Sequence, residues 1–473
     1  MLFNSLQFAA FLAAFVCVLA LLRGATPRLV ALILGSYAFY GAWDARFVLL
    51  LMAYTALGWF VGAWIHQARS ERARRMVLAG GVGLSLAGLA FFKYADFLAS
   101  SAAALLGLPV SEGFDIVLPV GISFFTFEVI SYLVDIHRRE TQPPRSFLHF
   151  ALFMAFFPRL VAGPIIRASD FLPQALRPIA FERENLLAGA RMFLVGLLLK
   201  VLCADNLSVF VDAVYADVAA YSSATLLFAA VCYSFQIFGD FAGYSLMGIG
   251  LARGLGFRLP PNFNMPYVAT SIAGFWHRWH ISLSTWLRDY LYISLGGSRR
   301  GSARTLANLT VTMVLGGLWH GASWNFVFWG LLHGLALVAH RLWSQSAAGR
   351  AAAQRLGAAY AGLGWFATFA LVTALWIPFR SPDFATTRLF FERLLSGTDG
   401  IEWIHTPSLV IVLGMAAWHA WTVFGPRVPW REILDPVLAR AGAAPAIFAA
   451  GFAALLLLMF GQQNASPFIY FQF

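Results

Sequence analysis

Apolar segments about as long as a membrane-spanning helix recur from one end of the sequence to the other. A helix needs roughly 20 mainly apolar residues to cross the hydrocarbon core of a bilayer. Candidate segments lie near 5–22, 29–43, 47–65, 76–93, 115–135, 148–166, 187–204, 222–238, 240–257, 306–319, 323–340, 358–377, 407–424 and 445–461. Lipid offers no partner to backbone N–H and C=O groups, so such segments fold as helices. We therefore expect an all-α integral membrane protein with about 11–13 crossings, the shortest segments being re-entrant.

The composition agrees with this class of protein. Of the 473 residues, 60% are hydrophobic and 12% are charged, whereas a soluble domain has about a quarter charged residues. The net charge of +11 fits Lys and Arg retained in cytoplasmic loops. We therefore expect membrane lipids around the chain and no nucleic acid as a partner. Because no internal repeat is evident, residues 1–473 are expected to form a single membrane-embedded domain.

Clusters of Lys and Arg between the apolar segments predict an orientation. The most basic loop is 66–75, and others are 137–145, 297–304 and 340–350. Loops of this kind stay in the cytoplasm. The last two loops fit the same side as the others if the two segments between them form a paired hairpin. The N-terminal segment, interpreted as a retained first helix, then begins on the opposite side. The loop 379–407 also faces outward in this arrangement.

The segment FWHRWHISLSTWLRDYLYI, at 275–293, is more polar than the others. At helical spacing, its tryptophans fall on one face and polar side chains on another. The polar face comprises His277, His280, Ser284 and Arg288. We therefore expect one amphipathic helix, lying in the interface or buried with its polar face toward a wet cavity. The preceding PPNFNMPY, at 260–267, has three prolines and is expected to be an irregular entry to this helix.

Two histidines, His320 and His333, lie inside the apolar stretch LGGLWHGASWNFVFWGLLHG, at 315–334. A polar ring within a membrane is costly, and such residues tend to line a functional interior or a water-filled cavity. The alternative is a hydrogen bond between helices that meet at small residues. Glycines beside His320 would allow a second backbone or a ligand to come close. From the residues alone, the functional and the structural interpretation of His320 are equally well supported.

Several motifs of known enzyme and metal sites are absent from the sequence, which limits the reactions it could catalyse. The sequence has no HExxH pattern, and no carboxylate lies beside these histidines at ligand spacing, so we expect no metal site. It also lacks GxSxG and a Walker-type loop, which disfavours a serine hydrolase and an NTPase. Four carboxylates lie within apolar segments: Glu128, Asp135, Asp205 and Asp240. Any of them could orient an imidazole, and the sequence does not choose among them.

Long motifs over nearly the whole chain resemble those of the membrane-bound O-acyltransferase (MBOAT) superfamily. Within it, the chain is similar to the bacterial alginate O-acetyltransferase type, which is related to the membrane D-alanyl transferase of teichoic acid. The motifs include MLFNSLQF (1–8), LPVGISFFTFEVISYLVDIHR (118–138), FFPRLVAGPIIR (156–167), KVLCADNL (200–207), DFAGYSLMGIGLARGLGFRLPPNF (240–263), FWHRWHISLSTWLRDYLYISLGG (275–297), LGGLWHGASWNFVFWGLLHG (315–334), ALWIPFRSPD (374–383) and PFIYFQF (467–473). The resemblance implies a ring of helices around a thinned centre with a tunnel between the membrane faces. It also implies a multi-pass protein of a bacterial inner membrane.

By the same resemblance, His320 matches the family's essential WHG histidine, and His280 matches the second histidine, in WHISLS. The implied reaction moves an acyl group, usually acetyl, from a cytoplasmic thioester to a hydroxyl of an extracytoplasmic polysaccharide. Acetyl-CoA or another thioester would be a co-substrate, and no bound cofactor is expected. A periplasmic acetyltransferase partner often completes the transfer in such systems. Leu246 stands where the alginate type often has an acidic residue, so the acceptor sugar stays open.

The implied reaction suggests a role for each candidate residue. A neutral His320 can take the proton of the accepting hydroxyl as general base, and His280 can orient the acceptor or stabilise the oxyanion. Arg278 and Arg288 are candidates for binding anionic parts of the donor. Further candidates for substrate or donor binding are Ser323, Asn325, Asp240 and Trp319. For the first two of these, a bond at a helix interface is an equal alternative, and His333 is expected to be structural.

Two other functions remain open at this point. A different MBOAT enzyme would use the same histidines to acylate a lipid or a protein. A transporter or channel would also have polar residues and broken helices at the middle of the membrane. The absence of repeat symmetry in the sequence and the long shared motifs favour the enzyme over the transporter.

Overall fold

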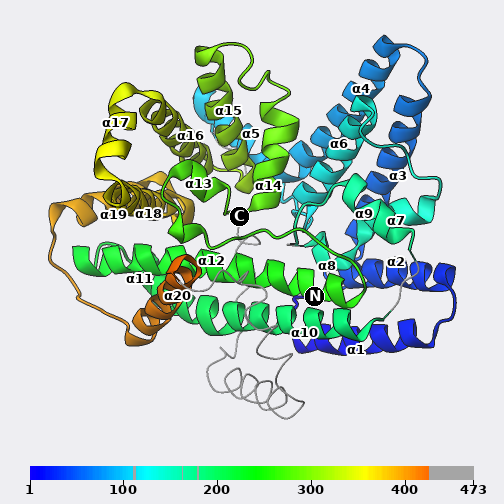
Figure 1. The fold of residues 1–473 in the computed structure, drawn as a ribbon, viewed down its shortest axis with the longest axis horizontal. Coiled ribbons are helices and arrows are strands. Elements are labelled where there is room, and N and C mark those ends of the chain that lie inside the picture. Colours follow the sequence, from blue (N-terminus) through cyan, green and yellow to red (C-terminus); the bar gives the residue numbers. More distant parts are fainter. Residues whose placement is uncertain (110–112, 162, 178–180, 425–473) are drawn as a thin grey trace. The chain divides into compact units, whose positions relative to one another are not determined.

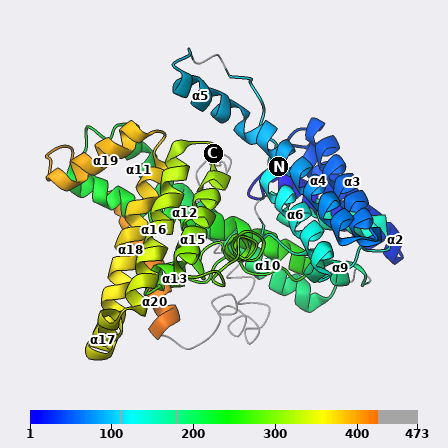
Figure 2. The ribbon, with the colours of Figure 1, turned by 90° about the horizontal axis from the view of Figure 1, so that it is seen from above.

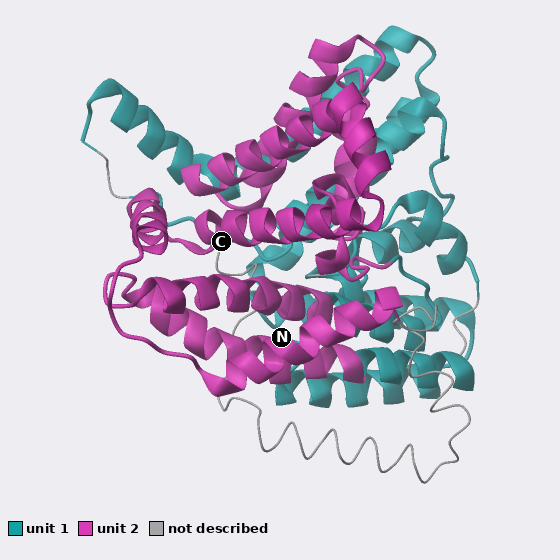
Figure 3. Ribbon diagram, turned by 60° about the vertical axis from the view of Figure 1, so that its left-hand side comes forward, with its two compact units in different colours: residues 1–193, 245–260 teal, residues 194–244, 261–473 magenta. Residues whose placement is uncertain are grey.

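The computed structural model describes the whole chain except residues 110–112, 162, 178–180 and 425–473. The chain folds into two compact units, which are coloured separately in Figure 3. Unit 1 comprises Met1–Phe193 and Ser245–Pro260. Unit 2 comprises Leu194–Tyr244 and the described chain from Pro261 onward. The single domain expected from the sequence stays a prediction.

Helices make up both units, and Figure 1 labels the α-helices in chain order. Those that begin in unit 1 are α1 (Leu6–Leu21), α2 (Ala25–Gly41), α3 (Arg46–Gln67), α4 (Glu71–Leu89), η1 (Ala90–Tyr94), α5 (Ala95–Leu106), α6 (Ile122–Arg138), α7 (Phe147–Ala155), α8 (Phe157–Leu160), α9 (Ala168–Ala175) and α10 (Arg183–Leu198). Those that begin in unit 2 are η2 (Leu199–Ala204), α11 (Asp205–Ala216), α12 (Ser223–Gly254), η3 (Pro266–Val268), α13 (Ile272–Trp276), α14 (Ile281–Trp286), η4 (Leu287–Tyr292), α15 (Ser302–His320), α16 (Trp324–Gln345), α17 (Ala347–Leu356), α18 (Ala358–Arg380), α19 (Phe384–Ser396) and α20 (Thr406–Phe424). The segments η1, η2 and η4 are π-helical, and η3 is a 3-10 helix. The described residues contain no β-strand, so the predicted all-α fold is confirmed.

Seven helical segments of the described chain are long and apolar enough to cross a membrane. They are Arg46–Gln67, Glu71–Leu106, Arg183–Ala216, Ser223–Gly254, Trp324–Gln345, Ala358–Arg380 and Thr406–Phe424. Each is close to or above the roughly 20 residues that a bilayer requires, which confirms a polytopic membrane protein. Other predicted crossings fall on shorter or more polar helices, such as α2 and α15. The predicted segment 445–461 lies outside the described residues.

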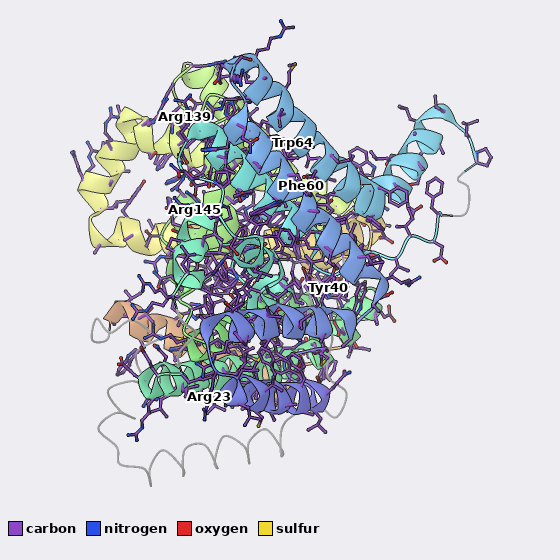
Figure 4. All side chains as sticks on the ribbon, turned by 90° about the vertical axis from the view of Figure 1, so that its right-hand side faces the viewer. Arg23, Tyr40, Phe60, Trp64, Arg139 and Arg145 are labelled. Carbon is purple, nitrogen blue, oxygen red and sulfur yellow. The ribbon has the colours of Figure 1, made fainter. Side chains whose placement is uncertain are left out.

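The outer face of α3 shows how these helices suit lipid. Phe60 and Trp64, one turn apart, have exposed fractions of 54% and 58%, and both lie on the outside of the helix in Figure 4. A water-soluble monomer rarely exposes large contiguous apolar patches. We therefore interpret this face of α3 as lipid-facing.

Unit 1 contains α6, nearly all of whose residues are buried. Glu128 of α6 forms an ion pair with Arg159 of α8, and both side chains are buried. The Arg159 guanidinium also lies over the rings of Phe153 and Phe171, at 4.9 and 5.5 Å from their centroids. A buried charge is strongly destabilising without a partner of opposite sign. Glu128 is therefore part of a buried ion pair of unit 1.

Three predicted segments are divided differently in the structure. The segments 222–238 and 240–257, predicted as separate helices, form the single 32-residue helix α12. Gly239, at the predicted break, instead allows close packing, because a Cβ there would lie 3.3 Å from the carbonyl oxygen of Leu199. The segment predicted at 148–166 is divided into α7 and α8. Pro158 has no N–H to continue the hydrogen bonds of α7.

The helices α15 and α16 form the paired hairpin that the basic loops predicted, and α16 also packs against α18 (Figure 2). The two helices meet backbone to backbone. A Cβ on Gly317 would lie 2.2 Å from the carbonyl oxygen of Phe326, and one on Gly330 would lie 2.3 Å from that of Met313. Small residues permit this close approach between membrane helices. The hairpin thereby fixes the turn that connects its two helices.

Candidate active site

The histidine of the WHG motif lies at the end of this hairpin. His320 is the last residue of α15, and α16 begins three residues after Gly321 with Ser323 as its N-cap. A Cβ on Gly321 would lie 2.1 Å from the ring of Phe326, so a larger residue would displace that ring. His320 is only 4% exposed. The turn between two packed helices thus holds a buried imidazole.

Three aromatic rings surround the imidazole of His320. The ring centroids of Trp319, Trp329 and Phe379 lie 5.1, 5.1 and 5.3 Å from it. The interplanar angles are 77°, 87° and 73°, so all three contacts are close to edge-to-face. Aromatic pairs favour this geometry, and each pair contributes about 0.5–1.5 kcal/mol beyond the area it buries. We call these three residues the aromatic box. These rings pack around an imidazole that is almost fully shielded from solvent.

His280 has an unusual backbone conformation. Its φ and ψ are 41° and 56°, in the left-handed region, where a residue with a Cβ is disfavoured. The two residues after His280 donate hydrogen bonds to Asn262. The carbonyl oxygen of Asn262 accepts from Ile281 N at 2.8 Å, and its Oδ1 accepts from Ser282 Oγ at 2.6 Å. Strain of this kind persists where surrounding bonds enforce it, and it often marks a functional site.

The side chain of His280 is fully buried. Neither ring nitrogen has a hydrogen-bond partner within the described part of the chain. Its ring instead meets Phe241 nearly edge to face, at 4.6 Å and 83°. His280 lies outside the seven membrane-crossing segments, and burial lowers the pKa of its imidazole to about 3. The ring is therefore neutral at neutral pH and able both to donate and to accept a hydrogen bond.

Trp319 connects the two histidines. Its ring centroid lies 5.8 Å from that of His280 and 5.1 Å from that of His320. The two histidines that the family resemblance selected, 40 positions apart in the sequence, therefore contact the same indole. This places Trp319, a predicted candidate, between them.

The continuous amphipathic helix predicted at 275–293 is wrong. The structure has a short helix α13, a turn, the short helix α14 and the π-helical segment η4 in its place. The left-handed conformation of His280 ends the helical path, so the predicted polar face is divided. His280 is buried, whereas His277 and Arg288 are exposed. The hydrogen bonds that Ile281 and Ser282 donate to Asn262 accompany this break, and the helical pattern does not reveal them.

The two candidate donor-binding arginines are less buried than His280 and His320. Arg278 is half-buried, and its Nη1 donates to the carbonyl oxygen of Asn264 at 2.9 Å. Arg288 is exposed, and its Nε lies 2.6 Å from Oδ1 of Asp289. Both guanidiniums thus have local partners, and their donor-binding role stays a prediction.

Ser323 and Asn325 make bonds at the ends of helices. Ser323 Oγ accepts from the backbone N–H of Asn325 at 3.2 Å and so caps α16. Asn325 Nδ2 donates to the carbonyl oxygen of Ser381 at 2.9 Å, just beyond the end of α18. These bonds fix the turn beside His320. They match the structural alternative for both residues, while substrate binding stays a prediction.

Asp240 lies in a buried ion cluster that sequence reasoning missed. Lys200 Nζ lies 2.6 Å from Asp240 Oδ1 and 2.7 Å from Asp205 Oδ1. All three side chains are at most 4% exposed. The signal for this cluster in the sequence was the spacing of five residues between Lys200 and Asp205, because a π-helix brings residues i and i+5 together. Two of the four carboxylates considered as orienting groups for a histidine are thus bonded to one lysine.

His333, on α16, lies in the same aromatic cluster as His320. Its ring centroid is 4.6 Å from that of Trp329 and 5.1 Å from that of Trp276. Trp329 therefore lies between His320 and His333. Among the described residues, no group of three or more His, Cys, Asp or Glu side chains is arranged to hold a metal ion.

Sequence comparison with known proteins decides the family. The model of MBOAT, the membrane-bound O-acyltransferase family, matches residues 111–378, which is more than half of the chain. The chain belongs to the membrane-bound O-acyltransferase family. The matched region contains both His280 and His320.

Relatives of this membrane-bound O-acyltransferase match it over much of its length. The probable alginate O-acetylase AlgI of Pseudomonas putida is 36% identical over 96% of each chain. The peptidoglycan O-acetyltransferase of Helicobacter pylori is 34% identical over 79% of this chain and 75% of its own. The teichoic acid D-alanyltransferase of Streptococcus thermophilus is 29% identical over 47% of this chain and 57% of its own. The protein is therefore an enzyme, an O-acyltransferase, in a multi-pass membrane fold.

Proposed function

We propose that this enzyme transfers an acetyl or other acyl group from a cytoplasmic thioester to a hydroxyl of an extracytoplasmic polysaccharide, in a bacterial inner membrane. His320 is the general base. The observation that carries the proposal is the buried imidazole in its aromatic box, joined to His280 through Trp319. The names of two relatives, an alginate O-acetylase and a peptidoglycan O-acetyltransferase, support a polysaccharide as the acceptor.

The proposed reaction balances without a bound cofactor. His320 accepts the proton of the acceptor hydroxyl while the hydroxyl oxygen forms a bond to the carbonyl carbon of the thioester. The C–S bond then breaks, and the thiolate leaves with the proton that the imidazolium returns. General-base assistance of this kind contributes about 10²–10⁴ in rate. His280, neutral and without a hydrogen-bond partner among the described residues, donates to the carbonyl oxygen as negative charge develops on it.

The position of His320 in its helix favours the proton transfer. His320 is the last residue of the 19-residue helix α15. The C-terminus of a helix carries a partial negative charge, which stabilises a cation there by about 0.3–1 kcal/mol or more. The imidazolium formed during the reaction gains this stabilisation. The aromatic box keeps water from the ring, which also limits hydrolysis of the thioester.

Replacement of His320 in cells tests the proposal. Cells lacking the native gene and expressing His320→Gln should contain no more polysaccharide O-acyl ester than the deletion strain. His66→Gln is the matched control, because His66 is an exposed histidine at the end of α3 and should restore the ester fully. Both variants must be present in the membrane in equal amounts. Full esterification with His320→Gln would contradict the base assignment.

The same strains separate the alternative functions. Acyl esters lost from a lipid or a protein fraction, with the polysaccharide unchanged, would assign another acceptor to the same histidines. Loss of the acyl group from a periplasmic acetyltransferase in the deletion strain would show that such a partner receives the group from this enzyme. Substrate flux into proteoliposomes without any acyl transfer would instead establish a transporter.

A further inference from the structure

The Lys200 cluster is a costly feature inside unit 2. One ammonium group faces two carboxylates at 2.6 and 2.7 Å, and all three side chains are buried. Burying charges costs several kcal/mol per ion, which their mutual attraction only partly offsets. A well-packed apolar cluster would stabilise the helices as well or better. The cluster therefore calls for a role beyond stability.

The cluster lies beside a close backbone contact between α12 and the segment that contains Lys200. A Cβ on Gly243 of α12 would lie 2.7 Å from the carbonyl oxygen of Gly196 and 3.0 Å from the amide nitrogen of Lys200. Lys200 belongs to the π-helical η2, and the N–H of Asp205 donates to its carbonyl oxygen. Such π-helical turns are frequent at functional sites. The ion pair between Lys200 and Asp240 thus fixes α12 against η2 at one position along its length.

Phe241, the neighbour of Asp240 on α12, contacts the site directly. It is fully buried, and its ring meets His280 at 4.6 Å and Phe263 at 5.0 Å, in both cases edge to face. The ring nitrogens of His280 have no hydrogen-bond partner within the described part of the chain. Packing, and above all the contact with Phe241, therefore sets the direction of this imidazole.

We propose that the Lys200–Asp240 ion pair is a positioning device for His280, acting through Phe241. The pair fixes the rotation of α12 about its axis and its position along that axis relative to η2. This rotation and this position determine where the edge of Phe241 meets the imidazole. The proposal rests on the role proposed above for His280. Asp240 is accordingly a positioning residue and does not bind the acyl donor.

The chain offers a matched pair of variants for the test, Asp240→Asn and Asp205→Asn. Both remove one carboxylate from the same Lys200 Nζ, at nearly the same distance and with the same burial. Only Asp240 adjoins Phe241. The purified full-length protein in proteoliposomes should lose similar thermal stability with either change. Asp240→Asn should lower kcat by on the order of tenfold or more, because small misplacements of reacting groups are costly, with KM for the thioester unchanged, whereas Asp205→Asn should lower kcat much less.

Equal loss of kcat in the two variants would overturn the proposal and leave the cluster with a purely structural role. An increase in KM for the thioester with Asp240→Asn would overturn it in favour of donor binding. Neither result would affect the assignment of His320, which is tested by His320→Gln.

A variant that leaves the ion cluster intact tests the proposal even where loss of a carboxylate prevents folding. Phe241→Leu keeps an apolar side chain but removes the edge that meets His280. It should lower kcat by a similar factor, and combining it with Asp240→Asn should cost little more, because residues that act through one contact are not additive. Fully multiplicative effects of the two substitutions would contradict a shared pathway through Phe241.

Discussion

At the scale of single residues, aromatic edges surround the imidazoles of both candidate histidines. His320 meets three rings within 5.1 to 5.3 Å, and His280 meets Phe241 and Trp319. Hydrogen bonds to backbone or carboxylate groups orient many catalytic histidines. Here the rings leave the polar atoms of His280 available for a substrate. This arrangement supports the role proposed for His280 in the reaction.

The aromatic box gives a prediction for Trp329, which is 1% exposed and contacts both His320 and His333. Trp329→Phe keeps an aromatic edge beside His320 and should retain kcat within about fivefold, whereas Trp329→Leu should lose on the order of a hundredfold, because ring positioning is lost. Transfer rates of both variants, compared at equal amounts of folded protein, measure this. A Leu variant as active as the Phe variant would show that the box does not position His320.

At the scale of elements, the α15–α16 hairpin depends on glycines at its contact. Gly317→Ala places a Cβ 2.2 Å from the carbonyl oxygen of Phe326, so the helices must separate and the turn with His320 must shift. The substitution should lower both the melting temperature and the transfer rate. Gly80→Ala, in the helix α4 with no atom within 4 Å of the added Cβ, is the control. It should be neutral or stabilise by about 0.5–1 kcal/mol. Equal melting temperatures for the two variants would contradict this packing.

The sequence predicted elements where local pattern and length decide the outcome. The hairpin followed from two apolar segments between basic loops, and the two histidines followed from motifs. The break at His280 could not be predicted, because the residues after it donate hydrogen bonds to Asn262, 18 positions before His280. The segments 222–238 and 240–257 were predicted as separate helices, but they form the continuous α12, in which Gly239 packs closely against Leu199 and Asp240 pairs with Lys200. These long-range bonds have no signature in helical periodicity.

At the scale of the whole molecule, the basic loops predict a defined orientation in the membrane for the apolar helices, seven of which lie in the described part of the chain. Cysteines placed at two exposed positions test it: Gln67→Cys, beside the basic loop 66–75, and Asp399→Cys, in the loop 379–407. The background should first lack the native cysteines, Cys17, Cys203 and Cys232. An impermeant thiol reagent added to intact spheroplasts should label only the variant at Asp399. Labelling of the variant at Gln67 instead would show that the chain has the opposite orientation.

The most direct test of the central claim is the single-turnover rate of acyl transfer by purified His320→Gln in proteoliposomes, compared with the native protein and His66→Gln. If His320 is the general base, the rate should fall by about 10²–10⁴, while thioester binding and the melting temperature stay near those of the native protein. His66→Gln should transfer at the native rate. A His320→Gln protein that binds the thioester and transfers its acyl group at the native rate would contradict the account.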